Sequence, residues 1–490
     1  MAIGLYTTRI VLDALGEINY GIYALVAGVV GMLAVLQSAM STTAMRYMSH
    51  SLGTGDEVLM AKTFNVIFFL HFIIGLGLVV FIEIGGYFLF EYFLDIPFNK
   101  LADAKVVFHL MAITTFIAII AVPYDAVINS HENLLALSVV DIIGALLKLS
   151  VAIYLTFTDL NLLIIYGIGV FLVQFIMRIM KQQYSIRKYK ECKINFKRGI
   201  DKNLIKEIMA FSGWNLFGSI ASMTETQIRG IILNMFFGVK INASEGIART
   251  ASGQINNISV SLTRAINPQL VKSEGSGDRQ KMLRITTIST KFSVLLFALI
   301  AIPVIIEMPF LLNIWLKDVP EYAVIFARLT LISLLISKFT FEITNAIRAV
   351  GRIKEFQVVE TIILVLNIPI TFALFKLAYP PSTIYFVSIL LSIITSIYRL
   401  YIGNKIAKLD ISEFIKNGIS PTLLPILIAI LTGVFVQLLI ENDLIKFISA
   451  FSISILSMLI CIRFFGLNKY ELGKINSLIQ TAKRKIYRNG

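Results

Sequence analysis

Residues 242–270 read NASEGIARTASGQINNISVSLTRAINPQL, a stretch that is long enough to cross a bilayer but too polar to face lipid. On a helix, apolar residues at three- and four-residue spacing would form one side: Ile247, Ala251, Ile255, Ile258, Leu262 and Ile266. The polar side would carry Arg249, Gly253, Asn256 and Thr263, with Gln254, Asn257, Ser261 and Arg264 beside them. A charge at the bilayer centre costs roughly 3 kcal/mol unless it faces protein or water. Together with the preceding segment 206–236, the stretch therefore predicts a helical hairpin that lines a hydrated internal cavity.

The composition places this hairpin in a membrane protein. The chain has 490 residues, of which 57% are hydrophobic and 15% charged, and its mean hydropathy is +0.80. Apolar runs of about 20 residues recur along it, which indicates an all-α polytopic membrane protein with about 14 transmembrane helices. Cys192 lies in a basic loop and Cys461 in a hydrophobic helix, so we expect neither a disulfide nor a metal site. We expect no cleavable signal peptide.

The expected helices are spaced along the whole chain. They span 2–14, 20–45, 63–94, 104–128, 133–156, 160–180, 206–236, 244–268, 284–312, 322–347, 356–378, 382–403, 421–441 and 444–465. The first rises only about 20 Å, less than a hydrocarbon core of about 30 Å. Either the natural start lies upstream of Met1, or this helix is incomplete.

The basic residues set the expected topology. The net charge is +14, and most of the 44 Lys and Arg fall in loops on one side of the predicted helices. By the positive-inside rule, both termini are expected to be cytoplasmic. This placement favours contact with anionic lipid and argues against nucleic acid as a partner.

Three pairs of segments indicate an internal repeat. They are GIYALVAG (21–28) with GIARTASG (246–253), HSLGTGD (50–56) with KSEGSGD (272–278), and SVVDIIGALLKLSVAIYL (138–155) with QVVETIILVLNIPITFAL (357–374). The offset is about 220 residues each time. The repeat predicts two six-helix bundles related by an axis along the membrane normal, which is typical of alternating-access transporters.

The predicted organisation follows from this repeat. It comprises an N-terminal six-helix bundle (1–180), a basic cytoplasmic loop (181–205), a C-terminal six-helix bundle (206–410), two extra transmembrane helices (411–466) and a basic cytoplasmic tail (467–490). No stretch is polar enough to form a separate soluble domain.

Charge within the predicted spans indicates the ligand. Several basic residues there, such as Lys148, Arg264 and Lys291, have no acidic residue one helical turn away. Cationic and polar walls suit an anionic, hydroxyl-rich ligand such as a sugar phosphate or a pyrophosphate. The candidate substrate-binding residues are Arg249, Arg264, Arg229, Lys148, Gln254, Asn256 and Asn257.

Glu225, His71 and Glu83 are candidates for coupling transport to an ion. Two of them have a simpler interpretation. Glu225 and Arg229 are one helical turn apart and could neutralise each other, and a buried, hydrogen-bonded histidine is more common than a proton relay.

No catalytic, metal or nucleotide-binding motif is evident in the sequence. SLGTGD at 51–56 faintly resembles a phosphate loop but lacks the Gly-Lys-Ser/Thr ending, so it predicts a turn between helices with a helix cap. Asp141 and Glu360, at equivalent repeat positions, suit helix starts.

Ten further segments are informative together. They are RIVLDALGEINYGIY (9–23), SAMSTTAMRYMSHSLG (38–53), AVINSHEN (126–133), WNLFGS (214–219), NMFFG (234–238), NASEGIA (242–248), AINPQLVKS (265–273), KFS (291–293), WLKDVPEY (315–322) and AVGRIKEFQ (349–357). In these the chain resembles the polysaccharide (O-antigen type) flippases of the multidrug/oligosaccharidyl-lipid/polysaccharide exporter superfamily, in particular a Bacteroidetes-like branch. Its short first helix departs from that pattern.

The resemblance implies a multi-pass protein of the bacterial inner membrane, with two six-helix bundles around a central cavity and a polyprenyl-pyrophosphate-linked oligosaccharide as cargo. It also implies a polysaccharide polymerase and glycosyltransferases as pathway partners, and no enzymatic activity. With the cationic residues, it predicts a monomeric, secondary-active flippase for surface polysaccharide assembly, driven by an H⁺ or Na⁺ gradient and without a cofactor. The alternatives are a drug or organic-cation exporter of the same superfamily, and a membrane glycosyltransferase or polymerase. The first would need an acidic, aromatic cavity, and the second a large outer loop.

Overall fold

The computed structural model describes residues 2–31, 34–92, 96–194, 201–316, 318–468 and 471–473, and in these residues it is helical with no strand. The helices of the first part of the chain are α1 (Ala2–Gly31), α2 (Ala34–Thr54), α3 (Glu57–Tyr92), α4 (Phe98–Ser130), α5 (Leu134–Leu155), α6 (Leu162–Lys188) and the short η1 (Lys190–Cys192). Next come α7 (Lys202–Phe237), α8 (Val239–Gly275), α9 (Arg279–Ile306), α10 (Met308–Trp315) and α11 (Ala323–Val350). The last part comprises α12 (Lys354–Val365), α13 (Asn367–Lys376), α14 (Thr383–Ala407), α15 (Ile411–Phe414), η3 (Ile415–Ile419), α16 (Ser420–Leu439), α17 (Asp443–Cys461) and η4 (Ile462–Gly466).

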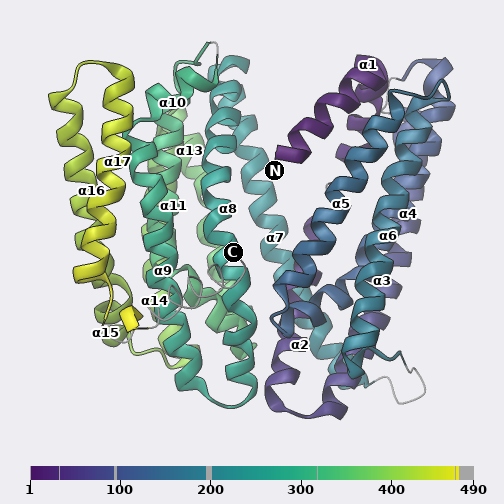
Figure 1. Ribbon diagram of the computed structural model, residues 1–490, viewed down its shortest axis with the longest axis horizontal. Coiled ribbons are helices and arrows are strands. Elements are labelled where there is room, and N and C mark those ends of the chain that lie inside the picture. Colours follow the sequence, from purple (N-terminus) through teal and green to yellow (C-terminus); the bar gives the residue numbers. More distant parts are fainter. Residues whose placement is uncertain are drawn as a thin grey trace, which may run out of the picture. The chain divides into compact units, whose positions relative to one another are not determined.

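The predicted fold class is confirmed, because ten of the described segments are long and apolar enough to cross a membrane. Every predicted helix has a counterpart in Figure 1. The two helices of the decisive hairpin, α7 and α8, have 36 and 37 residues but are not among the ten apolar segments. They are long enough to span a membrane, yet they are too polar to face lipid.

The start of the chain differs from the prediction. The predicted helix 2–14 and the break after it are confirmed by a kink at Gly16 that divides α1 (Ala2–Gly31). The predicted helix 20–45 is wrong in its bounds, because the part of α1 after the kink ends at Gly31 and α2 begins at Ala34. At the kink, Gly16 has φ 70° and ψ 168°, a conformation that costs glycine little, so the chain bends there and resumes its helix. The predicted second helix also ends too early, since α2 extends to Thr54.

The turns at the two glycine-rich repeats confirm the prediction of a helix-connecting turn with a cap. Gly55 follows α2 with φ 73°, and Gly277 follows α8 with φ 78°, so each ends its helix in the left-handed conformation that favours glycine. Asp56 then caps α3, since its carboxylate accepts hydrogen bonds from the backbone N–H groups of Val58 (2.9 Å) and Leu59 (3.0 Å).

Three predicted helices of the second half are subdivided. The helix expected at 284–312 is divided into α9 and α10, with the break at Glu307, four residues after Pro303. The helix expected at 356–378 is divided into α12 and α13 at Leu366. The one expected at 421–441 begins earlier, at Ile411, and passes through a π-helical turn (η3).

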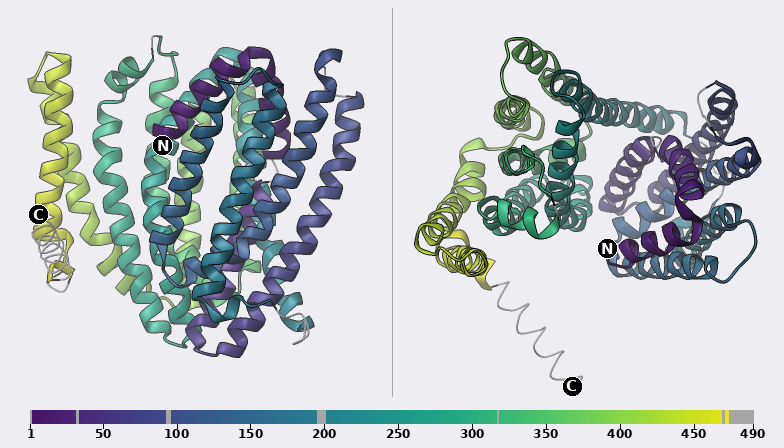
Figure 2. Two further views of the ribbon diagram at one scale, coloured as in Figure 1. Left: turned by 45° about the vertical axis from the view of Figure 1, so that its right-hand side comes forward. Right: turned by 90° about the horizontal axis from the view of Figure 1, so that it is seen from above.

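The chain forms two compact units. Unit 1 consists of residues 1–220 and 271–278, and unit 2 of residues 221–270 and 279–490. In unit 1, α4 packs against α3 and α6, and α5 packs against α6 and α1 (Figures 1 and 2). In unit 2, α11 packs against α9 and α14, and the pair α16–α17 covers α9. The division of the chain into bundles at 1–180 and 206–410, and the symmetry axis, remain predictions.

Each unit has a dry core of aliphatic and aromatic side chains. In unit 1, Val107, Phe108 and Leu163 are at most 3% exposed and bring α4 and α6 together. In unit 2, Phe297, Phe326 and further fully buried residues join α9 to α11. These cores fix the helices that carry the polar residues discussed next.

Candidate functional site

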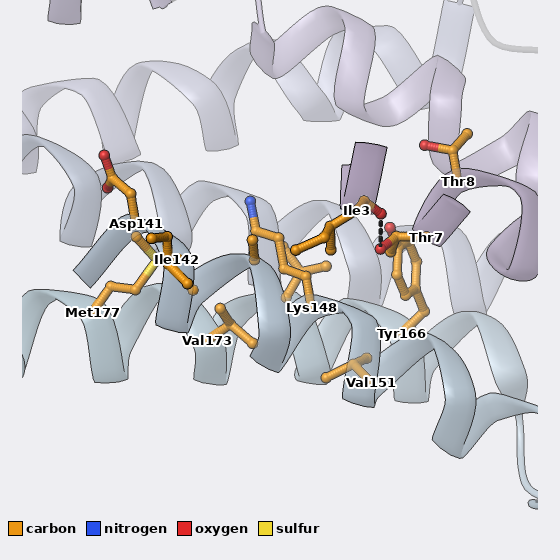
Figure 3. Close-up of a pocket in the computed structure, with 13 residues that line it drawn as sticks. Ile3, Thr7, Thr8, Asp141, Ile142, Lys148, Val151, Tyr166, Val173 and Met177 are labelled. Atoms are coloured by element: carbon orange, nitrogen blue, oxygen red, sulfur yellow. Dashed lines mark hydrogen bonds between the residues drawn. The ribbon is translucent and has the colours of Figure 1, made fainter. Parts of the chain in front are cut away.

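Unit 1 contains a pocket between α1, α5 and α6, with a volume of ≈ 650 Å³ (Figure 3). Its lining combines polar and apolar side chains: Ile3, Thr7, Thr8, Asp141, Ile142, Lys148, Val151, Tyr166, Val170, Val173 and Met177, together with Gly144 and Ala145. Asp141, Lys148 and Val151 come from α5, and Tyr166 and Met177 come from α6. A pocket of this size, mostly apolar with a few convergent polar groups, is typical of a small-molecule site.

Among the described residues, Lys148 is the only cation that lines this pocket. Seven residues separate it from Asp141, a rise of about 10 Å along the helix, which is too far for an ion pair. No ion pair of Lys148 occurs among the described residues. Figure 3 shows its side chain between Asp141 on one side and Thr7 and Tyr166 on the other. The Thr7 hydroxyl donates to the Ile3 carbonyl at 2.7 Å. The ammonium of Lys148 is thus available to an anionic ligand.

A polar cluster in unit 2 is centred on Glu225 and Arg229 of α7. The Arg229 Nη2 lies 2.7 Å from one oxygen of Glu225 and 2.9 Å from the other. Asn367 of α13 donates to the same carboxylate at 3.1 Å and to the hydroxyl of Ser388 on α14 at 2.9 Å. The predicted pairing of Glu225 with Arg229 at one helical turn is therefore confirmed.

Lys148 and Asn367 occupy equivalent positions in the internal repeat. The offset of 219 residues that aligns SVVD with QVVE carries Lys148 onto Asn367 and Tyr166 onto Tyr385. Two residues that line the unit 1 pocket, Lys148 and Tyr166, thus match residues in or beside the unit 2 cluster. Sequence reasoning missed Asn367, although the repeat alignment contains the signal that would have found it.

The polar face predicted for α8 is largely exposed. Arg249, Gly253, Gln254, Asn257, Ser261 and Arg264 are exposed, whereas Asn256 and Thr263 are half-buried. The Thr263 hydroxyl donates to Glu342 of α11 at 2.8 Å. Arg249 and Arg264 form no ion pair with any described residue. On a helix of membrane length, such a face must contact water, protein or a polar ligand rather than lipid.

One residue of the predicted apolar stripe of α8 lies elsewhere. Ile258 is 42% exposed, whereas its predicted neighbours Ile255 and Leu262 are half-buried. The helix is rotated so that Ile258 borders the polar face, next to Asn257 and Gln254. The apolar stripe is consequently narrower than its spacing suggested.

The ion-coupling candidates have different surroundings, and their roles remain predictions. His71 is 4% exposed, and its Nδ1 lies 2.8 Å from the Ile67 carbonyl, as expected for a buried, hydrogen-bonded histidine. Glu83 on α3 is paired with His109 on α4 at 2.7 Å. Sequence spacing gave no signal for His109, because the two residues belong to different helices.

Lys291 also has a partner that its own helix does not provide. Its ammonium lies 2.5 Å from Glu471, and both side chains are buried, at 4% and 6% exposure. A distance of 180 residues separates the pair along the chain. Lys291 is therefore neutralised within unit 2, which distinguishes it from Lys148, Arg249 and Arg264.

These helices define an all-α polytopic membrane protein. The solved structures that it resembles are transporters. A structure of MATE in the bent conformation has a TM-score of 0.72 and 11% sequence identity, covering 85% of this chain and 92% of that one. The MATE transporter ClbM in complex with Rb⁺ has a TM-score of 0.66 and 14% identity, covering 85% and 94%.

A third similar structure is that of a MOP superfamily transporter from Pyrococcus furiosus, with a TM-score of 0.66 and 12% identity, covering 83% of this chain and 93% of that one. It is described as having a binding pocket of reverse polarity that suggests a different function. No protein-family model matches the chain, and no curated protein matches it. The similarity to these solved structures shows that the protein has the fold of the MATE transporters of the MOP superfamily.

Proposed function

We propose that the protein is a secondary-active flippase, which moves a polyprenyl-pyrophosphate-linked oligosaccharide from the cytoplasmic to the outer leaflet for surface polysaccharide assembly. The observation that carries the proposal is the sign of the charges on its polar surfaces. Lys148 in the unit 1 pocket and Arg249 and Arg264 on α8 are cations without an ion-pair partner among the described residues. Unpaired cations within a membrane bundle are costly unless water or an anionic ligand compensates them.

The neighbouring side chains suit the rest of the cargo. Gln254 and Asn257 are exposed on the same helix as Arg249, and their amides can both donate to and accept from sugar hydroxyls. Arginine forms paired hydrogen bonds with phosphate oxygens, whereas lysine acts as a point charge. This combination fits an anionic, hydroxyl-rich headgroup better than an organic cation.

The fold supports the transport part of the proposal. In this fold, the headgroup would enter from the cytoplasm while the polyprenyl tail stays in lipid, and rocking of helical bundles would expose the headgroup outside. The Pyrococcus furiosus protein supports the idea that the polarity of a pocket can separate functions within one fold. We further propose an H⁺ or Na⁺ gradient as the driving force, and a polymerase and glycosyltransferases as pathway partners.

The decisive experiment replaces Arg249 with glutamine. In a cell that depends on this protein for its surface polysaccharide, Arg249→Gln should abolish export and leave lipid-linked oligosaccharide on the cytoplasmic face, at normal protein abundance. Arg249→Lys should restore export in part, since the charge survives while the paired hydrogen-bond geometry is lost. Arg352→Gln, which changes an exposed arginine between α11 and α12, is the matched control. Normal surface polysaccharide in Arg249→Gln would refute the proposed cation–headgroup contact.

A drug or organic-cation exporter is the second candidate, because Asp141 places one carboxylate in the unit 1 pocket. A similar structure is described as a multidrug resistance MATE transporter. Efflux of a cationic dye separates the two functions. An exporter of cations would lose dye efflux in Asp141→Asn and keep it in Lys148→Gln, whereas the flippase proposed here has no dye efflux to lose.

A further inference from the structure

The ion pair in the unit 2 cluster has the geometry of an arginine that binds an oxyanion. Arg229 donates from Nη2 to both carboxylate oxygens of Glu225, and its Nε lies 3.3 Å from the nearer one. The side chain of Arg229 is 20% exposed and that of Glu225 only 5% exposed. Glu225 thus uses the planar donor fork that arginine offers equally to carboxylates and phosphates.

Further side chains hold the carboxylate in place. Asn367 donates to Glu225 and to Ser388, so its amide nitrogen faces the carboxylate. Its carbonyl oxygen accepts from the Thr371 hydroxyl at 2.9 Å, which fixes that orientation. The pair is therefore a supported arrangement rather than a contact between two long surface side chains.

The internal repeat places this arrangement where unit 1 has an open pocket. Asn367 and Tyr385 match Lys148 and Tyr166, which both line that pocket. In unit 2 the guanidinium of Arg229 lies 5.9 Å from the Tyr385 ring. Unit 2 thus has its own cation together with a carboxylate already bound to it.

We propose that Arg229 is an anion-binding residue and that Glu225 is its internal competitor, which gives up Arg229 when it takes a proton. The inference rests on the proposed function, and it deepens that function by naming a proton that binds and leaves together with the headgroup. Because this proton moves outward with the headgroup, it is not the ion whose inward gradient would drive transport. When a phosphate or pyrophosphate binds, its oxygens replace those of Glu225 on the guanidinium. The carboxylate becomes a carboxylic acid by uptake of one proton from water, and release of the anion reverses both steps.

Electrostatics makes the proton necessary. Without it, the anion and Glu225 would place two negative groups against one guanidinium, in a site where charges interact more strongly than in water. Two charged residues of α8 lie nearby: Glu245 is within electrostatic reach of both Arg229 and Tyr385, and Arg249 is within reach of Tyr385. They carry opposite charges, so they do not replace the proton. When no anion is bound, Glu225 keeps Arg229 from being an uncompensated cation.

The test measures the binding of inorganic pyrophosphate to the purified full-length chain by calorimetry between pH 5.5 and 8. One coupled proton predicts that the affinity of the wild-type chain falls by up to about tenfold per pH unit as the pH rises. Glu225→Gln should bind about tenfold more tightly than the wild type near neutral pH, and Arg229→Gln should lose this site. Pyrophosphate itself titrates in this range. The pH dependence of the affinity that remains in Glu225→Gln therefore measures the part that is due to protonation of pyrophosphate. A parallel series in Lys148→Gln removes the contribution of the unit 1 pocket.

Two further variants keep the test decisive if Glu225→Gln folds poorly. Asn367→Ala removes a hydrogen bond to Glu225 without changing either charge, and it should raise the affinity for pyrophosphate severalfold. Glu360→Gln is the matched control, since it removes a carboxylate from the Arg399 pair and should leave the affinity unchanged. Equal affinity and an equal pH slope in the wild type, Glu225→Gln and Asn367→Ala would overturn the proposal. If Glu225→Gln binds pyrophosphate more tightly while Arg249→Gln still exports polysaccharide, this inference stands and the proposed contact of Arg249 with the headgroup is wrong.

Discussion

At the scale of single residues, the sequence identifies the charges but not their partners. The spacing of Glu225 and Arg229 within one helix predicts their contact, because residues four apart lie on the same face. The same rule cannot find His109 for Glu83, or Glu471 for Lys291, since tertiary packing creates those pairs. The sequence therefore predicts which polar residues belong to the candidate site, and the repeat relates some of them to one another. It does not predict which residues of different helices form pairs, because those contacts depend on the tertiary structure.

The Lys291–Glu471 pair gives a prediction about stability. Glu471→Gln should destabilise the protein by about 3–5 kcal/mol, because it leaves a buried ammonium without its counter-charge. The double variant Lys291→Met/Glu471→Leu should recover most of that loss, since an apolar pair of similar volume needs no compensation. Chemical denaturation of the purified protein in detergent measures both. Equal stability of the single and the double variant would contradict a role for the charge.

A second residue-scale prediction concerns Glu191, which lies beyond the end of α6. Burial disfavours its charged form, but three effects together outweigh burial and lower the pKa of Glu191: the hydrogen bond from His131 at 2.6 Å, a backbone hydrogen bond and the charge of His131. A lowered pKa contributes stability that is present above the ordinary value of 4.5 and is lost as the pH falls through the lowered one. Proteolysis of the segment around Cys192 should therefore accelerate below about pH 4.5.

Glu191→Gln is the variant that tests this link. It should make cleavage fast already at neutral pH and remove its acid dependence. The stacked rings of His131 and Tyr189, 4.1 Å apart, would remain and limit the size of the effect. A cleavage rate that stays acid-dependent in Glu191→Gln would assign the effect to another group.

At the scale of elements, hydrophobic periodicity predicts each helix but not its interruptions. Apolar runs locate the ten apolar spans because their length and composition are local properties, whereas α8 is predicted from the spacing of apolar residues within a polar stretch. The break between α9 and α10 and the break between α12 and α13 depend on backbone conformations that several sequences could adopt. The ends of α2 and α8 can be predicted from the sequence. The repeated Gly-x-Gly-Asp pattern marks the end of the helix, the turn after it and the cap of the helix that follows.

These two helix ends also contact each other reciprocally within unit 1. A Cβ added at Gly53 would collide with the carbonyl oxygen of Lys272, and one added at Gly275 would collide with that of His50. Gly53 matches Gly275, and His50 matches Lys272, in the repeat. The contact is therefore symmetric and brings backbone against backbone. Lys272 also pairs with Glu132 at 2.8 Å beside it.

Alanine at these glycines should consequently separate the helices. We expect Gly53→Ala and Gly275→Ala each to destabilise the protein by about 1–3 kcal/mol, the usual range for overpacking a tight contact. Gly213→Ala is the matched control, because nothing lies within 4 Å of its added Cβ. Alanine there should be neutral or stabilise α7 by up to about 1 kcal/mol. Thermal unfolding of the three variants, compared at equal detergent concentration, measures the difference.

At the scale of the whole molecule, the distribution of basic residues is the property that orients the chain. The most basic loop follows α6, and Lys188 lies at its start. The segment between α10 and α11, which includes Asp318, lies three predicted spans further along. An odd number of crossings separates the two, so they must face opposite sides of the membrane if every predicted span crosses it.

Cysteine labelling tests this topology in intact cells. Cys192 and Cys461 are both buried and are first replaced by alanine, so that the chain carries no other thiol. A cysteine at Asp318 should react with a membrane-impermeant thiol reagent added outside, whereas one at Lys188 should react only after the cells are opened. A loop rich in lysine and arginine resists translocation, which is why we place Lys188 on the cytoplasmic side. That side also decides the direction of transport, because a headgroup made in the cytoplasm must first bind where the Lys188 loop lies. Labelling of Lys188→Cys from outside would invert the topology and make export of a cytoplasmic lipid-linked sugar untenable.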